Sequence, residues 1–246
     1  MSILGIIPVR YHSSRFPGKA LADVHGKTMI QRVYEQAMLA ESLDRVVVAT
    51  DHPKIFDHIN EIGGKVCMTS EDHPSGTDRC REAMELEPDG YDFVVNIQGD
   101  QPFIDPRQID DLCKNLVPDI QIATQARRIE MQELLIDPNC VKVIIDSQDK
   151  AIYFSRSPLP FQRAHSVDEW ISSHQYYQHI GIYAYRSDIL QKITQLAMSP
   201  LEQAEGLEQL RWLENGYSIK VFTTNYHAQG IDTPEDLEKA LASNHS

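Results

Sequence analysis

Short apolar runs alternate along the first half of the chain with segments in which apolar residues recur at helical spacing. The apolar runs predict strands at residues 3–8, 45–49, 65–68 and 93–97. The helical patterns lie at residues 29–40, 54–62 and 77–86. Strands that alternate with helices are typical of a doubly wound, mostly parallel α/β sheet. Ligands bind outside the carboxyl ends of the strands in such sheets, so we expect the loops after these strands to share one rim.

The second half is less regular. Residues 141–145 and 152–154 predict a hairpin, and residues 157–175 have no clear period and predict a loop or mobile lid. Further strands are expected at 179–185 and 219–223, and a helix is expected at 202–216. The last helix has a clear start signal, with Thr233 as the N-cap, Pro234 at the first helical position and Asp236 closing a capping box.

The charge balance argues against a general nucleic-acid partner. The 246 residues include 36 acidic and 23 basic side chains, which gives a formal net charge of −13, whereas nucleic-acid backbones need clustered lysine and arginine. The four cysteines form no closely spaced pair, which favours reduced thiols. The sequence has neither the start of a signal peptide nor the roughly 20 apolar residues of a membrane span. We therefore expect a cytoplasmic protein without membrane insertion.

A cationic turn follows the first predicted strand. It contains Arg10, Arg15, Gly18 and Lys19. Arginine binds phosphate oxygens in a bidentate way and lysine acts as a point charge, so this turn can surround a triphosphate. It matches neither the dinucleotide-binding motif nor the P-loop. A solvated basic loop is the alternative interpretation.

Two aspartates follow glycines within two residues, at places where they can hold a metal ion. Asp100 follows Gly99 at the end of the fourth predicted strand, and Asp232 follows Gly230 by two residues, just before the last helix. Mg²⁺ prefers one or two carboxylates together with phosphate oxygens, so the two aspartates are candidate magnesium ligands. An ordinary turn would equally explain Asp100, and an acidic helix entry would explain Asp232.

The segment before the third predicted helix offers polar groups for a nucleoside. Ser75, Gly76 and Thr77 have backbone and hydroxyl groups that can hydrogen-bond a ribose or a base. The competing interpretation is that Ser75 only caps the helix.

Together with further motifs, these segments resemble one family. In chain order the motifs are RYHSSRFPGK at 10–19, HPSGTDR at 73–79, NIQGDQP at 96–102, HIGIYAYR at 179–186, LEQLR at 207–211 and GIDTPEDL at 230–237. This order is similar to that of the 3-deoxy-manno-octulosonate (Kdo) cytidylyltransferases, and the resemblance extends over about residues 3–241. A sialic-acid cytidylyltransferase is expected to share only the first motif, and that loosely.

The resemblance implies a fold and a reaction. The fold would be an α/β domain of nucleotide-diphospho-sugar transferase type over residues 1–246. Residues 1–125 and 186–246 would form the nucleotide-binding core, and residues 126–185 a smaller lobe for sugar binding and dimerisation. The reaction would transfer CMP from CTP to Kdo with Mg²⁺, releasing pyrophosphate and providing CMP-Kdo for lipopolysaccharide synthesis. The resemblance also implies a homodimer.

The resemblance further implies roles for individual residues. The catalytic residues would be Arg10, Lys19, Asp100 and Asp232, with both aspartates as metal ligands. The nucleotide would be bound by Arg10, Arg15, Lys19, Ser75, Gly76, Thr77 and Asp100. The sugar would be bound by Gln98, Arg156, Arg163, His179, Tyr183, Glu208 and Gln209.

The chain departs from the family pattern mainly at the sugar end. Gln101 stands where a glutamate is common, and Gln162 lies in a run where the family has carboxylates. An 8-amino-8-deoxy analogue of Kdo, which a neighbouring group in the family uses, is the competing substrate, although the loss of these carboxylates does not by itself favour an amino sugar. The motifs are also compatible with a catalytically silent nucleotide-binding regulatory protein and with a transferase that uses a different base or sugar.

Overall fold

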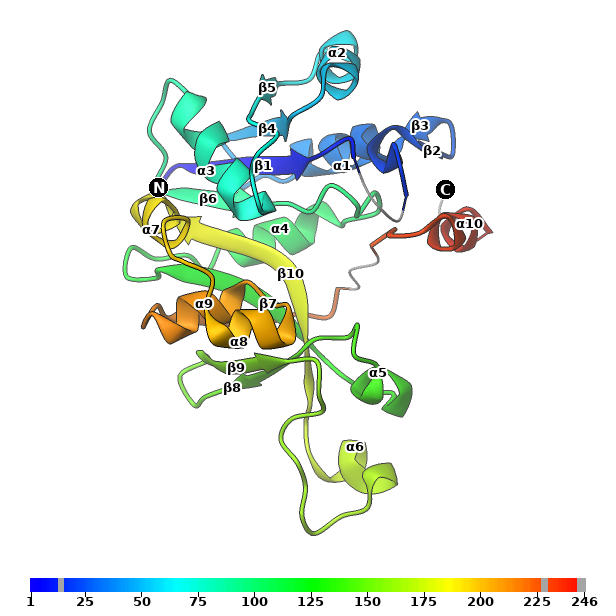
Figure 1. Cartoon of the computed structure of the whole chain (residues 1–246), viewed down its shortest axis with the longest axis vertical. Helices are drawn as coiled ribbons and strands as arrows, with labels where there is room; N and C mark the ends of the chain where they lie inside the picture. Colours follow the sequence, from blue (N-terminus) through cyan, green and yellow to red (C-terminus); the bar gives the residue numbers. More distant parts are fainter. Residues whose placement is uncertain (13–15, 227–229, 243–246) are drawn as a thin grey trace. The chain divides into compact units, whose positions relative to one another are not determined.

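The four apolar runs of the first half form parallel strands in the computed structural model, which describes residues 1–12, 16–226 and 230–242 (Figure 1). These strands are β1 (Ile3–Val9), β4 (Arg45–Thr50), β5 (Val66–Met68) and β6 (Phe93–Asn96). β1 pairs with β4 on one side and β6 on the other, and β5 pairs with β4. The expected mostly parallel α/β sheet is confirmed.

The strand order changes direction at β1. The chain passes from β1 to β4 and then to β5 on one side, whereas β6 returns to the opposite side of β1. In open α/β sheets, ligands bind at such a point because the loops after the two neighbouring strands diverge there. Arg10 follows β1, and the segment that leads to Asp100 follows β6.

The chain divides into two compact units. The first contains residues 1–115, 184–194 and 227–246, and the second contains residues 116–183 and 195–226. The proposed division into a nucleotide-binding core and a sugar-binding lobe is functional and stays a prediction.

The described helices of the first unit begin at a side-chain cap, with the exception of α7. They are α1 (Met29–Met38), α2 (Pro53–Glu61), α3 (Gly76–Leu86), α4 (Pro106–Cys113), α7 (Ser187–Ile193) and α10 (Pro234–Ala242). At α10 the Asp236 N–H donates to Thr233 Oγ1 and the Thr233 N–H donates to the Asp236 carboxylate, so the predicted capping box is confirmed. The unit also has a short 3₁₀ helix, η1 (Lys19–Leu21), and a small hairpin of β2 (Asp23–Val24) and β3 (Lys27–Thr28).

The strands of the second unit include the expected hairpin. They are β7 (Ile122–Arg128), β8 (Lys142–Ile145), β9 (Ala151–Ser155), β10 (Tyr177–Arg186) and β11 (Ile219–Thr223). β8 and β9 pair antiparallel, while β7 and β11 pair parallel. The apolar pattern did not reveal β7. The end of β10, from Ala184 onward, belongs to the first unit.

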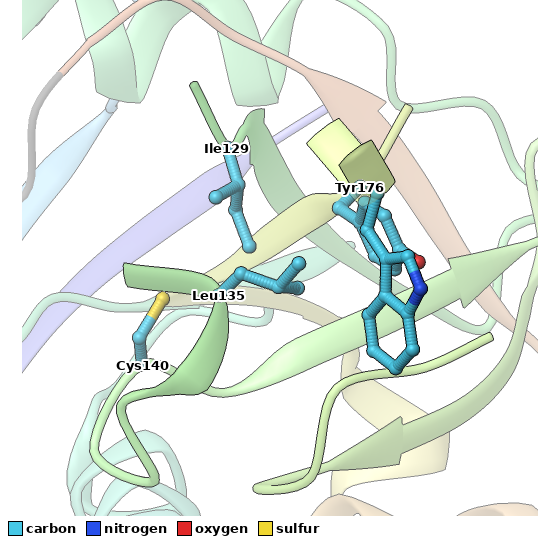
Figure 2. Close-up of a cluster of buried hydrophobic side chains, with 5 residues drawn as sticks. Ile129, Leu135, Cys140 and Tyr176 are labelled. Atoms are coloured by element: carbon cyan, nitrogen blue, oxygen red, sulfur yellow. The ribbon is translucent and has the colours of Figure 1, made fainter. Parts of the chain in front are cut away.

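The segment 157–175 is not entirely irregular. It contains η2 (Val167–Glu169) and α6 (Trp170–Ser173), which follow a capping box formed by Ser166 and Glu169. Trp170 is buried in a cluster with Ile129, Leu135, Cys140 and Tyr176, near the short helix α5 (Gln132–Ile136) (Figure 2). A single helical turn is too short to produce a visible period, which is why the sequence predicted a loop.

The prediction of one continuous helix over residues 202–216 is wrong. The structure has two helices, α8 (Pro200–Glu205) and α9 (Gln209–Glu214). Gly206 adopts a left-handed conformation with φ of 62°, and its N–H donates to the Glu202 carbonyl at 2.7 Å, which ends α8. Glycine adopts this conformation without the steric cost of a Cβ atom.

Within the part of the chain that the structure describes, no helix combines the length and apolar character needed to cross a membrane.

Candidate functional site

A cleft of about 230 Å³ opens at the carboxyl end of β1. Arg10 lines it from the end of β1, and Ser75 and Gly76 line it from the start of α3. The cleft therefore lies at the point where the strand order reverses. A cation and a helix amino terminus both face it, and both favour an anionic ligand.

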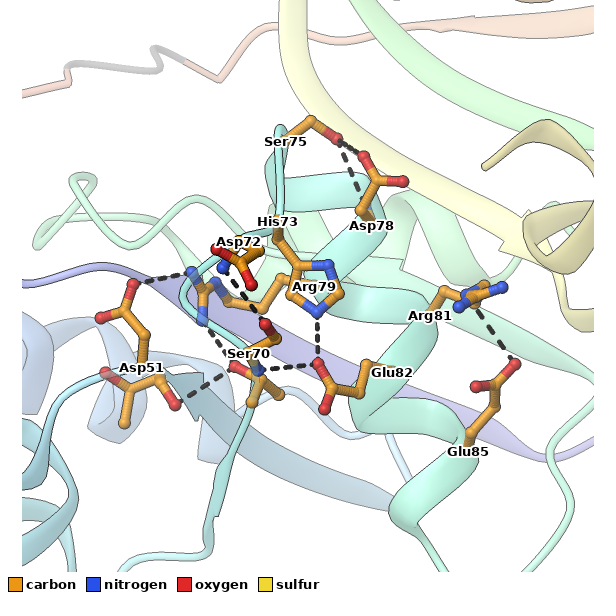
Figure 3. Close-up of polar contacts among 12 residues, drawn as sticks. Asp51, Ser70, Asp72, His73, Ser75, Asp78, Arg79, Arg81, Glu82 and Glu85 are labelled. Atoms are coloured by element: carbon orange, nitrogen blue, oxygen red, sulfur yellow. Dashed lines mark hydrogen bonds and ion pairs between the residues drawn. The ribbon is translucent and has the colours of Figure 1, made fainter. Parts of the chain in front are cut away.

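The start of α3 is shaped by its own cap. Ser75 Oγ accepts the Asp78 N–H at 3.2 Å and donates to Asp78 Oδ2 at 2.6 Å (Figure 3). A Cβ atom on Gly76 would lie in ordinary contact with Pro8 Cγ, at 3.4 Å, on the wall of the cleft. Thr77 is buried. The capping interpretation of Ser75 is thus correct, and the same residue also lines the cleft.

Two carboxylates and one ammonium group meet in the first unit. Lys19 Nζ lies 2.9 Å from Asp100 Oδ2 and 3.0 Å from Asp232 Oδ1. The side chains are 17%, 29% and 45% exposed, respectively, so the group is open to solvent on one side. Its formal charge is −1, which favours cations over anions at this place.

Apolar neighbours bring these polar groups together. A buried cluster contains Ile231, which precedes Asp232. Phe16, just before Lys19, and Phe103, just after Asp100, pack against this cluster. The Ile231 N–H also donates to the Asp100 carbonyl at 2.9 Å. Burial of the large apolar side chains thus fixes the positions of the polar residues beside them.

Two glycines permit this geometry. Gly18 has φ of 72° and begins the turn that carries Lys19. A Cβ atom on Gly99 would meet the Pro8 carbonyl oxygen at 3.2 Å, so only glycine allows the segment after β6 to approach the end of β1 without displacement.

The aspartate pair fits a hard divalent cation bound together with a nucleotide. Among the residues that the structure describes, no group of three or more histidine, cysteine, aspartate or glutamate side chains could hold a metal ion. Two carboxylates are enough for Mg²⁺, which keeps several water ligands and takes phosphate oxygens from a substrate. A closed structural zinc site would need four protein ligands.

Two arginines predicted to bind the nucleotide, and Gln98, predicted to bind the sugar, belong to the same half of the chain. Arg10 is exposed on the wall of the cleft. Arg15 lies outside the described residues. Gln98, predicted for the sugar, belongs to the first unit and its Nε2 donates to Asn96 Oδ1 at 3.4 Å.

His179 and Tyr183, predicted for the sugar, pack within the second unit. His179 Nε2 lies 3.1 Å from Thr124 Oγ1, and its ring contacts the Phe154 ring edge-on. Burial lowers the pKa of His179 to about 3, because the charged imidazolium is disfavoured away from water. Tyr183 is buried and packs edge-on against Trp212.

The other residues predicted to bind the sugar include an arginine whose side chain donates hydrogen bonds to backbone carbonyls. Arg156 donates to the carbonyls of Pro138, Glu205 and Gly206. Glu208 Oε1 lies 3.1 Å from Arg211 Nη2. Gln209 is buried, whereas Arg163 is exposed.

The sequence interpretation did not single out two charged residues beside the cleft. Asp51 and Arg79 form a buried ion pair, and Arg79 lines the cleft (Figure 3). Asp51 directly follows β4, so the strand-end rule that selected Asp100 would have found it as well. Arg79 is the last residue of the motif that contains Ser75, and one helical turn separates the two.

Comparison with known proteins identifies the class of the chain. Residues 4–220 match a family model described as "Cytidylyltransferase". Taken with the parallel sheet and the site at its strand ends, this match defines the chain as a nucleotidyltransferase of the cytidylyltransferase class. Enzymes of this class generally use a divalent metal ion.

The more similar relatives narrow the class to one family. The chain is 53% identical to the 3-deoxy-manno-octulosonate cytidylyltransferase of Parabacteroides distasonis, with 98% of each chain covered. It is 51% identical to the enzyme of the same name from Cytophaga hutchinsonii, with 96% of this chain and 95% of the relative covered. A solved structure of CMP:2-keto-3-deoxy-manno-octonic acid synthetase complexed with CTP matches with a TM-score of 0.92, 42% identity and 98% of each chain covered. The chain belongs to the 3-deoxy-manno-octulosonate cytidylyltransferase family, which confirms the family and the fold type that the motifs indicated.

Proposed function

We propose that this chain transfers CMP from CTP to 3-deoxy-manno-octulosonate and releases pyrophosphate. The observation that carries the reaction type is the meeting of Asp100 and Asp232 at Lys19. The relatives' names support the choice of sugar, at about half identity over nearly the full chain. The product would be the activated sugar used in lipopolysaccharide synthesis.

The residues of the first unit have separate tasks in this reaction. Arg10 faces the cleft, where its guanidinium can bind phosphate oxygens in a bidentate way. Lys19 and Arg15 add positive charge for the triphosphate and for the departing pyrophosphate. The amino terminus of α3, with Ser75 and Gly76 in the cleft, offers polar groups to the nucleoside. No covalent intermediate with a side chain is required, because a hydroxyl of the sugar acid attacks the α-phosphorus directly and pyrophosphate leaves on the opposite side.

Asp100 and Asp232 would hold Mg²⁺ in this proposal. When bound, the metal ion neutralises developing charge on phosphate oxygens and lowers the pKa of a hydroxyl that it contacts. Asp100 and Asp232 would hold the ion next to the Lys19 ammonium. The residues predicted for the sugar are Gln98, Arg156, Arg163, His179, Tyr183, Glu208 and Gln209. The neutral imidazole of His179 would then act by packing or hydrogen bonding rather than by charge.

A homodimer and a cytoplasmic location complete the proposal. The dimer follows from the resemblance of the motifs to the family, with residues 126–185 as the expected dimerisation lobe. The cytoplasm is where CTP is made and where four free cysteines stay reduced.

The decisive experiment is a pyrophosphate-release assay with CTP, Mg²⁺ and either Kdo or 8-amino-Kdo. We expect faster release with Kdo. Faster release with the amino sugar would reassign the substrate, and CTP binding without release with either sugar would support a catalytically silent protein. UTP, ATP and GTP in place of CTP test the choice of base.

A substitution links the assay to the site. Asp100→Ala is expected to lower the rate of pyrophosphate release at least about a hundredfold, since it removes charge that acts on the transferring phosphate. Asp111→Ala is the matched control, because Asp111 is an exposed aspartate on α4 with a surface contact to Lys114. Substantial activity in a folded Asp100→Ala variant would remove Asp100 from the metal role.

A further inference from the structure

A buried ion pair lies beside the nucleotide cleft and has no role in the reaction described above. Arg79 Nη2 is 2.8 Å from Asp51 Oδ2, and the two side chains are only 5% and 12% exposed (Figure 3). Taking two charges out of water is costly, so such a pair is expected only where its geometry is well satisfied.

The pair connects segments that carry different parts of the cleft. Asp51 Oδ1 accepts the N–H of Tyr11, the residue after Arg10, at 3.3 Å. Arg79 Nη1 donates to Thr69 Oγ1 at 2.5 Å, and Thr69 in turn bonds the carbonyl of Thr50. The ends of β1, β4 and β5 are therefore joined through one carboxylate and one guanidinium.

Arg79 also connects this junction to the start of α3. It lies on the first turns of α3, and its N–H donates to the Ser75 carbonyl at 3.3 Å. Arg10 and Ser75 line the same cleft as Arg79 itself. The Asp51–Arg79 contact thus lies in a chain of hydrogen bonds that runs from Tyr11, next to Arg10, to Ser75 at the start of α3.

We propose that Asp51 and Arg79 are positioning residues that hold the phosphate-binding turn at Arg10 in register with the nucleoside-binding start of α3. This role rests on the proposed function, since the ligand in question is CTP. The planar guanidinium donates from two nitrogens to two different acceptors, Asp51 and Thr69, and a lysine ammonium does not reproduce this fork.

The chain contains a matched control pair on the same two elements. Arg45 is the first residue of β4 and Glu87 directly follows α3, and Arg45 Nε lies 2.5 Å from Glu87 Oε2. This pair joins the opposite ends of β4 and α3, about 20 Å along the strand from Asp51. If the Asp51–Arg79 pair only stabilised the fold, substitutions in the two pairs should have the same effect on KM for CTP.

The experiment measures steady-state kinetics of pyrophosphate release together with the melting temperature. The variants are Asp51→Asn, Arg79→Lys and the double variant, with Arg45→Lys and Glu87→Gln as controls. We expect the first two to raise KM for CTP at least about tenfold, because misplacement by about 1 Å is enough for losses of this size. KM for Kdo should stay within about twofold, since most residues predicted for the sugar lie elsewhere in the chain. The KM for CTP of the double variant should not exceed that of the more impaired single variant, as expected for residues that act as a unit.

Three outcomes would overturn the proposal. The first is an unchanged KM for CTP in folded Asp51→Asn and Arg79→Lys. The second is an equal rise of KM in the Arg45 and Glu87 variants at the same loss of melting temperature. The third outcome applies if the Asp51 and Arg79 variants do not fold. Thr69→Val removes one acceptor of Arg79 and keeps the ion pair, so it should then raise KM for CTP about threefold. An unchanged KM for CTP in Thr69→Val would refute the positioning role. Absence of pyrophosphate release from the unaltered enzyme would refute the proposed function instead.

Discussion

Replacement of Lys19 by methionine tests how the carboxylate pair receives a metal ion. In the structure the Lys19 ammonium lies 2.9 Å from Asp100 and 3.0 Å from Asp232, where it compensates one of the two negative charges. A divalent cation that binds these carboxylates without nucleotide competes with the ammonium. Lys19→Met leaves an uncompensated charge of −2 at the pair, so we expect it to bind divalent ions more tightly than the unaltered protein.

The distances set the size of the effect. Coulomb's law gives about 1.4 kcal/mol for each pair at about 3 Å in water. The side chains are between 17% and 45% exposed, so screening and side-chain entropy reduce each contribution to about 0.5–1 kcal/mol. The sum of about 1–2 kcal/mol corresponds to roughly a fivefold to thirtyfold gain in affinity for the metal ion.

Electron paramagnetic resonance of Mn²⁺ in the absence of nucleotide measures this affinity directly. CTP binding to the same variant should become weaker, since Lys19 is also proposed to bind the triphosphate. Lys27→Met is the control, because Lys27 forms an exposed ion pair with Glu35 in the same unit. An unchanged or weaker Mn²⁺ affinity in Lys19→Met, at an unchanged melting temperature, would refute the reasoning.

Two further predictions concern the backbone at Gly99 and the imidazole of His179. Gly99→Ala places a Cβ atom 3.2 Å from the Pro8 carbonyl oxygen, so we expect a loss of about 1–3 kcal/mol in the free energy of unfolding and a higher KM for CTP. Gly90→Ala is the control, because a Cβ atom at Gly90 meets nothing within 4 Å. An unchanged free energy of unfolding and an unchanged KM in Gly99→Ala would contradict the close approach. For His179, the folded pKa of about 3 lies below the usual value of 6.5, so the unfolded chain binds the extra proton between these pH values and stability falls as pH decreases through this window, by at most about 1.4 kcal/mol per pH unit. Urea unfolding at pH 7 and pH 5 should show a larger loss for the wild type than for His179→Gln, and equal losses would show that the imidazole is protonated in the folded state.

Local chemistry accounts for the parts of the fold that the sequence predicted well. The strands β1, β4, β5 and β6 and the helices α1, α2 and α3 follow the apolar pattern, whereas α4, α7 and the β2–β3 hairpin were not predicted. α1 buries the face of Met29, Ile30, Val33, Tyr34 and Ala37 that the spacing selects. The cap at Thr233 depends only on residues within one turn. The break at Gly206 was missed, because its neighbours continue the helical pattern and only the positive φ shows where the helix ends.

The sequence by itself determined which chemical groups the protein carries and on which strand ends and helix starts they lie. The apolar pattern could not determine their meeting, which only the resemblance of the motifs implied, because Lys19 is separated from Asp100 by 81 positions and from Asp232 by 213. That meeting depends on the burial of apolar neighbours from distant segments into one cluster, and the contact of Asp51 with Arg79 depends in the same way on the packing of α3 against the sheet. Periodicity is a property of neighbouring residues, whereas convergence of this kind is decided only when the whole core packs.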